Sequence, residues 1–310
     1  MKKEEKALFF DLCKFQDVNP EELKRRLRAG CATSAVLGAL FWNRTAGVAY
    51  GVLAENQALD LINREFRSSL KGAYQQNQQQ NSSFYTCLTL LNQVLLPCRG
   101  KYAMLKGAVL CGAYPEGFRT SNDIDLLVRG EDVTAVGKAL TAAGFKQGYV
   151  RNGRLVVASR QEIISSKMMR GETVPYILEV NLPLMPFLEV DLNFSLDYKN
   201  GDPSLVSGLI ARSQRMRVHG TEITTLNRVD FVIHLCDHLY KEATTYPWVH
   251  MHRDMTLYKY LDLYFLLNGL TETSAADMSR RIDELGTQRA CYYAVACSRT
   301  LFSIENPAVA

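Results

Sequence analysis

Two aspartates stand two positions apart in the stretch Ser121-Asn-Asp-Ile-Asp-Leu-Leu-Val128. Side chains at positions i and i+2 of a β-strand point to the same face, so Asp123 and Asp125 would lie side by side while Ile124 and Leu126 face the core. Neighbouring carboxylates repel each other, and divalent cations offset this repulsion. Because hard oxygen ligands suit Mg²⁺, the pattern predicts a magnesium site on a strand. A solvated strand face is the alternative for an isolated Asp-x-Asp pair.

Two further segments carry chemistry that fits such a site. Upstream, Lys106-Gly107 closes an apolar strand and opens a turn into a helix, a geometry in which backbone N–H groups and a lysine hold phosphates. Downstream, the alternating strand 187–194 places Glu189, Asp191 and Asn193 on one face, so a third carboxylate is available. A glycine turn, an Asp-x-Asp strand and a later acidic strand are together the parts of a two-metal site for in-line attack on a nucleotide phosphate.

A pair of histidines forms a second candidate cluster. His234 and His238 are four positions apart, which places them on one face of a helix, and His250 and His252 follow. The spacing permits Zn²⁺. Packing or hydrogen bonding within the core is the favoured interpretation, contact with a substrate the second, and a metal site the third.

The elements that must position these residues follow from periodicity. Apolar residues recur every three or four positions up to about residue 97, which predicts an N-terminal helical region, 1–97. Within it, the tract Gln75 to Ser83 holds five Gln and two Asn. This tract is either a solvated stretch of one long helix or a loop that joins two helices.

The period changes after residue 97. Expected strands at 102–106, 123–128, 155–159, 174–182 and 187–194, with a helix from Gly107 to Tyr114 and another ended by Gly144, predict a mixed α/β core over 98–200. Helices return from Pro203, with candidates at 203–213, 228–242, 254–267 and between 275 and 302, so 201–310 is expected to be a C-terminal helical region. The expected fold class is α+β.

Composition excludes several classes of protein. The 310 residues, 47% hydrophobic and 22% charged, are typical of a globular chain that buries a sizeable core. A net charge of +4 with interspersed signs does not favour nucleic acid as a partner. The longest uncharged run, Ala29 to Asn43, is shorter than the ~20 apolar residues of a membrane span and predicts a buried helix.

The N-terminus and the cysteines indicate a compartment. The chain begins Met-Lys-Lys-Glu-Glu-Lys and continues into an amphipathic pattern without an apolar signal core, which favours a cytoplasmic location. Eight cysteines are scattered without a CxxC pair, so reduced and mostly buried thiols are expected.

At this point the chain resembles a known family, the bacterial "uncharacterised nucleotidyltransferase" family within the polymerase-β-like nucleotidyltransferase superfamily. The residues that carry the resemblance are Leu105-Lys106-Gly107, Tyr114-Pro115, Arg119 and Ser121-Asn122-Asp123-Ile124-Asp125-Leu126-Leu127-Val128, then Val190-Asp191-Leu192 and the helix from Phe231 to His238. The resemblance covers roughly residues 60–270. It implies a polymerase-β-like core, a mixed sheet with flanking helices, between the two helical regions.

The resemblance also implies an activity. Asp123 and Asp125 would bind both Mg²⁺ ions, and Asp191 would complete the site of the nucleophile's metal and take the acceptor's proton. Glu189 is the alternative third acid, and Glu179 is a weaker one because it is the only acid on its face. The substrate would be a nucleoside triphosphate such as ATP, the reaction would transfer NMP to an acceptor hydroxyl, and pyrophosphate would leave.

Two departures from the pattern keep other functions open. Ala108 stands where the superfamily carries Ser, so Lys106, Arg119 or Ser121 would have to supply the phosphate contact, with Gly107 allowing close approach; Asn193 stands where the family carries His. A catalytically silent member that binds nucleotide or protein is one alternative, and a toxin-type nucleotidyltransferase that modifies tRNA or protein is another. The acceptor is a small molecule, a protein side chain or an RNA end, with RNA disfavoured by the mild charge.

Overall fold

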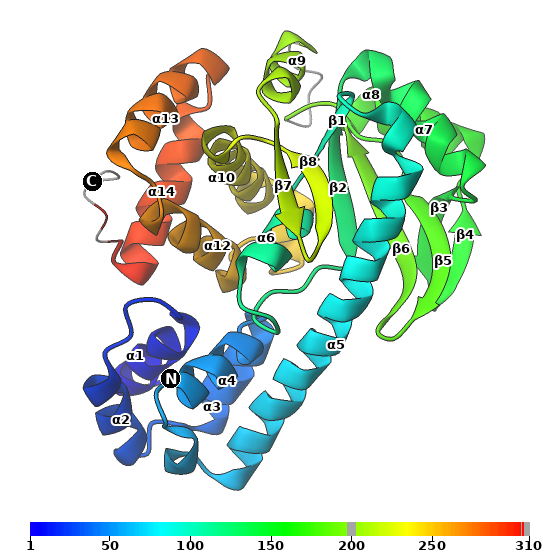
Figure 1. The fold of residues 1–310 in the computed structure, drawn as a ribbon. Coiled ribbons are helices and arrows are strands. Elements are labelled where there is room, and N and C mark those ends of the chain that lie inside the picture. Colours follow the sequence, from blue (N-terminus) through cyan, green and yellow to red (C-terminus); the bar gives the residue numbers. More distant parts are fainter. Residues whose placement is uncertain (197–202, 305, 307–310) are drawn as a thin grey trace.

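The computed structural model describes residues 1–196, 203–304 and 306 and shows an α+β protein (Figure 1). Four short helices form the N-terminal end of the molecule. The helix α2 begins with its first N–H groups bonded to the side chain of Asn19, which satisfies donors that a helix start leaves open. The bounds are α1 Lys3–Cys13, α2 Pro20–Arg28, α3 Ser34–Trp42 and α4 Ala46–Glu55, followed by a 3-10 turn at Leu59–Leu61.

The uncharged run 29–43 was predicted to be a buried helix, and the structure corrects this in part. Only α3 within it is helical, and of its apolar residues Val36 and Leu40 are buried. Phe41 and Trp42 have 47% and 66% of their surface exposed. The C-terminal turn of α3 therefore presents aromatic side chains to solvent, which matters for the cavity described below.

One long helix settles the alternatives left open for the polar tract. Helix α5 runs without a break from Arg64 to Val94, and Asn63 caps its first turn. Its N-terminal half packs on α4 and its C-terminal half packs on β6 and β8 (Figure 1). The tract of Gln and Asn residues is thus the middle of a helix that connects the N-terminal helices to the sheet.

The sheet has eight strands in the order β4-β3-β5-β6-β2-β1-β8-β7. Strand β2 is parallel to β6 and β1 is parallel to β8, whereas the other neighbours are antiparallel, so the sheet is mixed. The bounds are β1 Tyr102–Met104, β2 Asp123–Val128, β3 Lys146–Arg151, β4 Arg154–Val157, β5 Tyr176–Leu182, β6 Met185–Asn193, β7 Gln214–Val218 and β8 Thr221–Thr225.

The prediction that the chain is purely helical after Pro203 is wrong, because strands β7 and β8 lie in this region. They form a hairpin that extends the sheet beyond β1, so the sheet draws on the region 201–310 as well as on 98–200. The boundary predicted at residue 200 itself lies outside the described residues. His219 and Gly220 both have positive φ, which is the geometry of a two-residue hairpin turn. This His-Gly pair was the sequence signal for the hairpin, and hydrophobic periodicity alone does not detect it.

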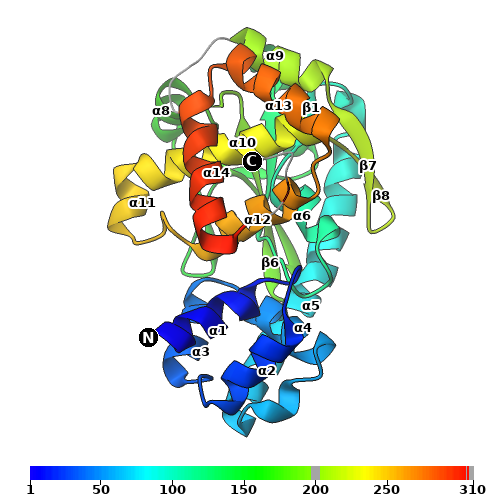
Figure 2. The same ribbon diagram turned by 90° about the vertical axis from the view of Figure 1, so that its left-hand side faces the viewer.

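Helices complete the core on both sides of these strands. Helix α6 (Gly107–Ala113) follows β1, and the C-terminal helices α10, α12, α13 and α14 pack on one another (Figure 2). The other bounds are α7 Val133–Ala142, α8 Arg160–Arg170, α9 Pro203–Ala211, α10 Arg228–Thr244, α11 Tyr246–His250, α12 Leu257–Asn268, α13 Glu272–Leu285 and α14 Gln288–Phe302, with 3-10 turns at Leu96–Cys98 and Gly130–Asp132.

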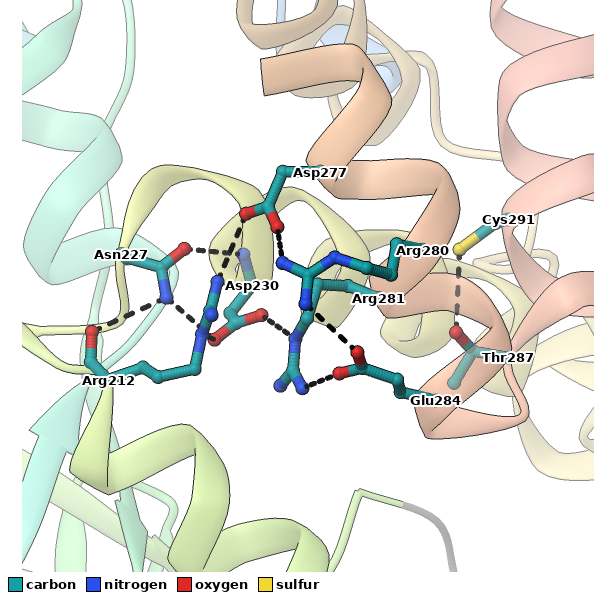
Figure 3. Close-up of polar contacts among 9 residues, drawn as sticks. All are labelled: Arg212, Asn227, Asp230, Asp277, Arg280, Arg281, Glu284, Thr287 and Cys291. Atoms are coloured by element: carbon teal, nitrogen blue, oxygen red, sulfur yellow. Dashed lines mark hydrogen bonds and ion pairs between the residues drawn. The ribbon is translucent and has the colours of Figure 1, made fainter. Parts of the chain in front are cut away.

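A buried carboxylate ties the C-terminal helices together. Asp230 at the start of α10 accepts hydrogen bonds from Arg212 Nε at 3.0 Å and from Arg281 Nε at 2.9 Å (Figure 3). Because α9, α10 and α13 meet at this one buried acid, their relative positions are fixed by paired charges as well as by apolar packing.

All eight cysteines are free thiols, and seven of them are buried. Within the part of the chain that the structure describes, no helix combines the length and the apolar character needed to cross a membrane.

Candidate active site

The acidic residues of β2 and β6 meet on one face of the sheet. The two strands are parallel neighbours whose register pairs Asp123 with Glu189 and Asp125 with Asp191. Neighbouring strands lie about 4.8 Å apart, so this register brings four carboxylates together. The opposite face of β6 is fully buried, with Leu188, Val190 and Leu192 at 0% exposure, and this burial fixes which face the acids occupy.

Glu179, the weaker candidate, does not join this cluster. It lies on β5 opposite Phe187 and is exposed outside the cavity that the other acids line. The structure thus gathers Asp123, Asp125 and Asp191 with Glu189 and leaves Glu179 apart.

Burial and mutual repulsion raise the pKa values of three acids in the cluster. Burial, and then the charges of Asp125 and Asp123, raise the pKa of Asp191 well above its ordinary value. Burial and the charge of Asp125 likewise raise the pKa of Asp123, and burial with the same two aspartates raises the pKa of Glu189. A cluster of this kind favours a bound cation, because the cation removes the cost of keeping these carboxylates ionised.

Lys106 supplies part of that positive charge. Its Nζ lies 2.7 Å from Asp125 Oδ1, and Asn193 Nδ2 donates to the same oxygen at 3.4 Å. Burial alone lowers the pKa of Lys106, but the charge and hydrogen bond of Asp125 outweigh it, so the ammonium stays protonated. In the structure Lys106 neutralises a carboxylate, and its contact with phosphate stays a prediction.

Gly107 and Ser121 position Asp123. Ser121 Oγ donates to Asp123 Oδ1 at 2.9 Å, and a Cβ on Gly107 would lie 2.2 Å from that same Ser121 Oγ. Only glycine permits this approach. The N–H groups of Ala108 and Val109 donate to the carbonyls of Leu105 and Lys106, so these two donors are engaged within the glycine turn.

Arg119 lines the cavity with its charge already paired. Its Nε donates to both oxygens of Asp262, at 3.1 and 3.2 Å, and its guanidinium lies 4.8 Å from the ring centre of Tyr258. Through this pair Arg119 joins the loop before β2 to helix α12, and its contact with phosphate stays a prediction.

Three side chains from the polar tract of α5 hold the loop that leads into β2. Asn81 donates to the Arg119 carbonyl at 2.8 Å and accepts from the Gly117 N–H at 3.0 Å. Asn77 donates to the Gly117 carbonyl at 2.8 Å, and Gln80 donates to the Ser121 carbonyl at 3.3 Å. These positioning residues were missed because the tract was interpreted as a linker or solvated face. The available signal was the run of seven consecutive amide residues, 75–81.

A cavity of about 840 Å³ lies over the acidic cluster. Its walls come from the turn after α3, from β2 and β6, from α10 and from the segment α11–α12, so every region of the chain contributes. Among the lining residues are Phe41, Trp42, Arg44, Lys106, Gly107, Arg119, Ser121, Asp123, Asp125, Glu189, Asp191, Asn193, His234, His238, Lys241, Trp248, Arg253, Tyr258 and Lys259. The volume suits a small-molecule substrate rather than a single ion.

The chemistry of the acidic donors fits Mg²⁺, because all four are hard carboxylate oxygens. Among the described residues, however, no group of three or more His, Cys, Asp and Glu side chains is already arranged to hold a metal ion. The pairing of Asp125 with Lys106 gives a reason, since it engages one of the carboxylates that such a site would use. The zinc site considered for His234 and His238 is likewise not formed by the described residues.

The fold and the acid-lined cavity define an α+β protein with a candidate phosphate-chemistry site. The sequence pattern of the family described as "Uncharacterised nucleotidyltransferase" matches residues 32–303, so the chain belongs to that family. It is similar in structure to an antigenic nucleotidyltransferase-like protein from Paracoccidioides brasiliensis, with 16% sequence identity, a TM-score of 0.34, and coverage of 66% of this chain and 91% of the other. A comparison with curated proteins finds no match.

Proposed function

We propose that this protein transfers a nucleoside monophosphate from a nucleoside triphosphate to an acceptor hydroxyl and releases pyrophosphate. The observation that carries the proposal is the register of β2 and β6, which pairs Asp125 with Asp191 and Asp123 with Glu189 at the wall of the cavity. Membership of the nucleotidyltransferase family supports nucleotide transfer in general. In this proposal β1, β2, β6 and α6 correspond to the polymerase-β-like core.

The acidic residues would have distinct roles. Bound Mg²⁺ would act as a Lewis acid on the phosphate and offset the charge that develops during transfer. Asp123 and Asp125 would hold both ions, with Ser121 orienting Asp123 through its 2.9 Å hydrogen bond. Asp191 would complete the nucleophile's side of the site and accept the acceptor's proton, a role that its raised pKa favours. Glu189, paired in register with Asp123, is the alternative third acid.

Binding of nucleotide can be tested before the acceptor is known. The full chain is titrated with ATP, CTP, GTP and UTP in turn, with and without Mg²⁺, while its thermal unfolding is followed. A ligand at 100 times its dissociation constant stabilises a protein by about 2.7 kcal/mol, so a Mg²⁺-dependent rise in Tm is expected for at least one nucleotide. Asp123→Asn and Asp191→Asn are expected to lose that rise, because each removes a charged ligand.

Glu179→Gln is the matched control, since it removes an acid from the same sheet outside the cavity. It is expected to keep the full Mg²⁺-dependent rise. A normal rise in folded Asp123→Asn and Asp191→Asn protein would overturn the assignment of these acids.

A silent nucleotide-binding member is the second candidate, and one observation favours it. Lys106 already pairs with Asp125, and Ala108 brings no hydroxyl to the turn that Lys106 opens. Such a protein would show the same Mg²⁺-dependent binding but no pyrophosphate release when extracts containing acceptors are added. Release that depends on Asp191 would decide for the transferase.

A further inference from the structure

A buried histidine on α10 faces the cavity without a hydrogen-bond partner. His234 is only 8% exposed, lines the cavity, and neither ring nitrogen has a partner among the described residues. Buried polar atoms nearly always find a partner, because leaving one unpaired costs free energy. His238, one turn further along α10, stacks near it with ring centres 6.3 Å apart and also lines the cavity. A ligand that reaches this wall would supply the absent hydrogen bonds.

Three lysines and one glutamate line the cavity around this wall, and Glu242 Oε1 of that set lies 3.5 Å from His238 Nε2. Lys106, Lys241 and Lys259 line the same cavity, and Lys259 Nζ lies 2.5 Å from Glu242 Oε2, the acid one turn after His238. Burial, and then the charges of Lys106 and Lys241, lower the pKa of His234 to about 3, so its imidazole is neutral at physiological pH. A neutral imidazole offers one N–H donor and one acceptor nitrogen. The cavity thus has an acidic wall on β2 and β6 and a wall on α10 that carries imidazoles beside one lysine and one glutamate.

A triphosphate whose reacting phosphorus lies at the acids must place two more phosphates in this cavity. The N–H groups of Ala108 and Val109 are bonded within the turn, Lys106 is paired with Asp125, and Arg119 is paired with Asp262. The groups expected to hold these phosphates are therefore engaged elsewhere. The α10 wall is the part of the cavity where a buried imidazole, without a hydrogen-bond partner in the described part of the chain, faces the ligand space.

We propose that His234 and His238, with the lysines beside them, bind the pyrophosphate part of the nucleoside triphosphate. The inference rests on the proposed function. In the transfer step the acceptor oxygen forms a bond to the α-phosphorus, and the bond to the bridging oxygen breaks with its electron pair remaining on pyrophosphate. The acceptor's proton goes to Asp191, and the imidazole N–H of His234 donates to an oxygen of the departing pyrophosphate.

Inorganic pyrophosphate is a direct probe of this site. The full chain is titrated with it by calorimetry in the absence of divalent metal, and His234→Phe, which keeps a ring but removes both nitrogens, is compared with wild type. Loss of a hydrogen bond to a charged group weakens binding by about tenfold or more, and that loss is expected here. His234→Gln, which restores an N–H donor, is expected to recover part of the affinity. His250→Phe, an exposed histidine outside the cavity, should bind as wild type does.

Asp191→Asn separates this inference from the proposed function. Because it removes negative charge, it should keep or strengthen pyrophosphate binding even where it abolishes Mg²⁺-dependent nucleotide binding. If the metal site fails its own test, a His234-dependent pyrophosphate site still stands. Wild-type protein that binds no pyrophosphate, or folded His234→Phe protein that binds it as tightly as wild type, overturns the inference. If His234→Phe does not fold, His238→Phe decides by the same tenfold criterion.

Discussion

Asp191 occupies the least favourable electrostatic position in the acidic cluster. It is half-buried on β6, three other carboxylates raise its pKa, and Lys106, which opposes them, is bonded to Asp125 instead. Ionising Asp191 therefore costs more free energy in the folded protein than in the unfolded chain. Under the proposed function, the site gains affinity for a cation at the expense of stability without one, which is a common trade at functional sites.

This cost predicts that Asp191→Asn stabilises the metal-free protein. The folded pKa is raised, so the penalty is absent below the ordinary aspartate pKa of about 4 and grows as pH rises toward the folded value. At pH 7.5 with EDTA, the free energy of unfolding should rise by on the order of 1–2 kcal/mol, and the gain should shrink toward pH 5. Urea unfolding at a series of pH values measures it.

Asp60→Asn controls for the change of charge, because that carboxylate is 97% exposed. It should alter the free energy of unfolding by less than about 0.5 kcal/mol at any of these pH values. A folded Asp191→Asn protein that is less stable than wild type at pH 7.5 would contradict the electrostatic argument.

For single residues, the alternation along each strand predicted which acidic side chains share a face. It did not predict which charged side chains form ion pairs. Alternation alone places Asp123 with Asp125, and Glu189 with Asp191, on shared strand faces. The partner of Arg119 is Asp262, 143 residues away along the chain. Its pairing depends on how α12 packs beside the loop, which no local pattern contains.

At the scale of elements, α5 anchors the loop that carries Arg119 and Ser121. Asn81 is 1% exposed and bonds both the Gly117 N–H and the Arg119 carbonyl. A backbone segment without regular structure needs such partners when it is buried. The polar tract therefore contacts the loop from the helix side. Its amide side chains make hydrogen bonds to backbone groups of the loop that a neighbouring strand would make in a sheet.

Asn81→Leu should show this dependence. Two buried backbone groups lose their partners, so the free energy of unfolding is expected to fall by about 2–4 kcal/mol, as measured by urea unfolding. Mg²⁺-dependent nucleotide binding should weaken as well, because Ser121 on the same loop orients Asp123.

The comparison is Gln79→Leu, an exposed residue of the same tract. It tests whether any loss of amide in α5 has the same effect, and it should leave stability and binding close to wild type. Equal losses in both variants would mean that the contact with the loop is not the cause.

Most of the elements that carry site residues could be predicted from the sequence. Strand β7 could not, and the reason is physical. Strand β2 was predicted with its observed bounds, Asp123–Val128, because a buried apolar run alternates with acids there. In β7 only Met216 and Val218 alternate with the exposed Arg215 and Arg217, and an alternation this short is a weak signal for a strand. Its position is set by pairing with β8, and β8 in turn by pairing with β1.

At the scale of the whole molecule, the N-terminal helices are joined to the C-terminal ones near the cavity. Asn43 Oδ1 accepts the N–H of Leu257 at 2.9 Å, and the residue that precedes α12, Thr256, provides no side-chain cap of its own. Tyr264 on α12 donates to Asp17 at 3.1 Å. A residue next to α3 thus caps a helix 214 positions later.

Asn43→Ala should release that cap. Loss of a helix cap typically costs about 1 kcal/mol, which urea unfolding resolves, and Asn43→Asp, which keeps an acceptor oxygen, should retain most of the stability. We also expect faster proteolysis near residue 256 in the alanine variant. Equal stability and equal cleavage in the two variants would show that the hydrogen bond does not hold these regions together.

Helix α5 limits where recombination between related genes can divide the chain without separating residues that contact each other. Its 31 residues span about 46 Å, from the N-terminal helices at one end to the sheet at the other. Recombination between two relatives at residue 97 would take α5 from one parent and the loop it anchors from the other. A crossover before Arg64 would transfer the loop, its anchor and the acidic strands together. The smallest exchangeable unit of this protein therefore begins with α5 and not with the first strand of the sheet.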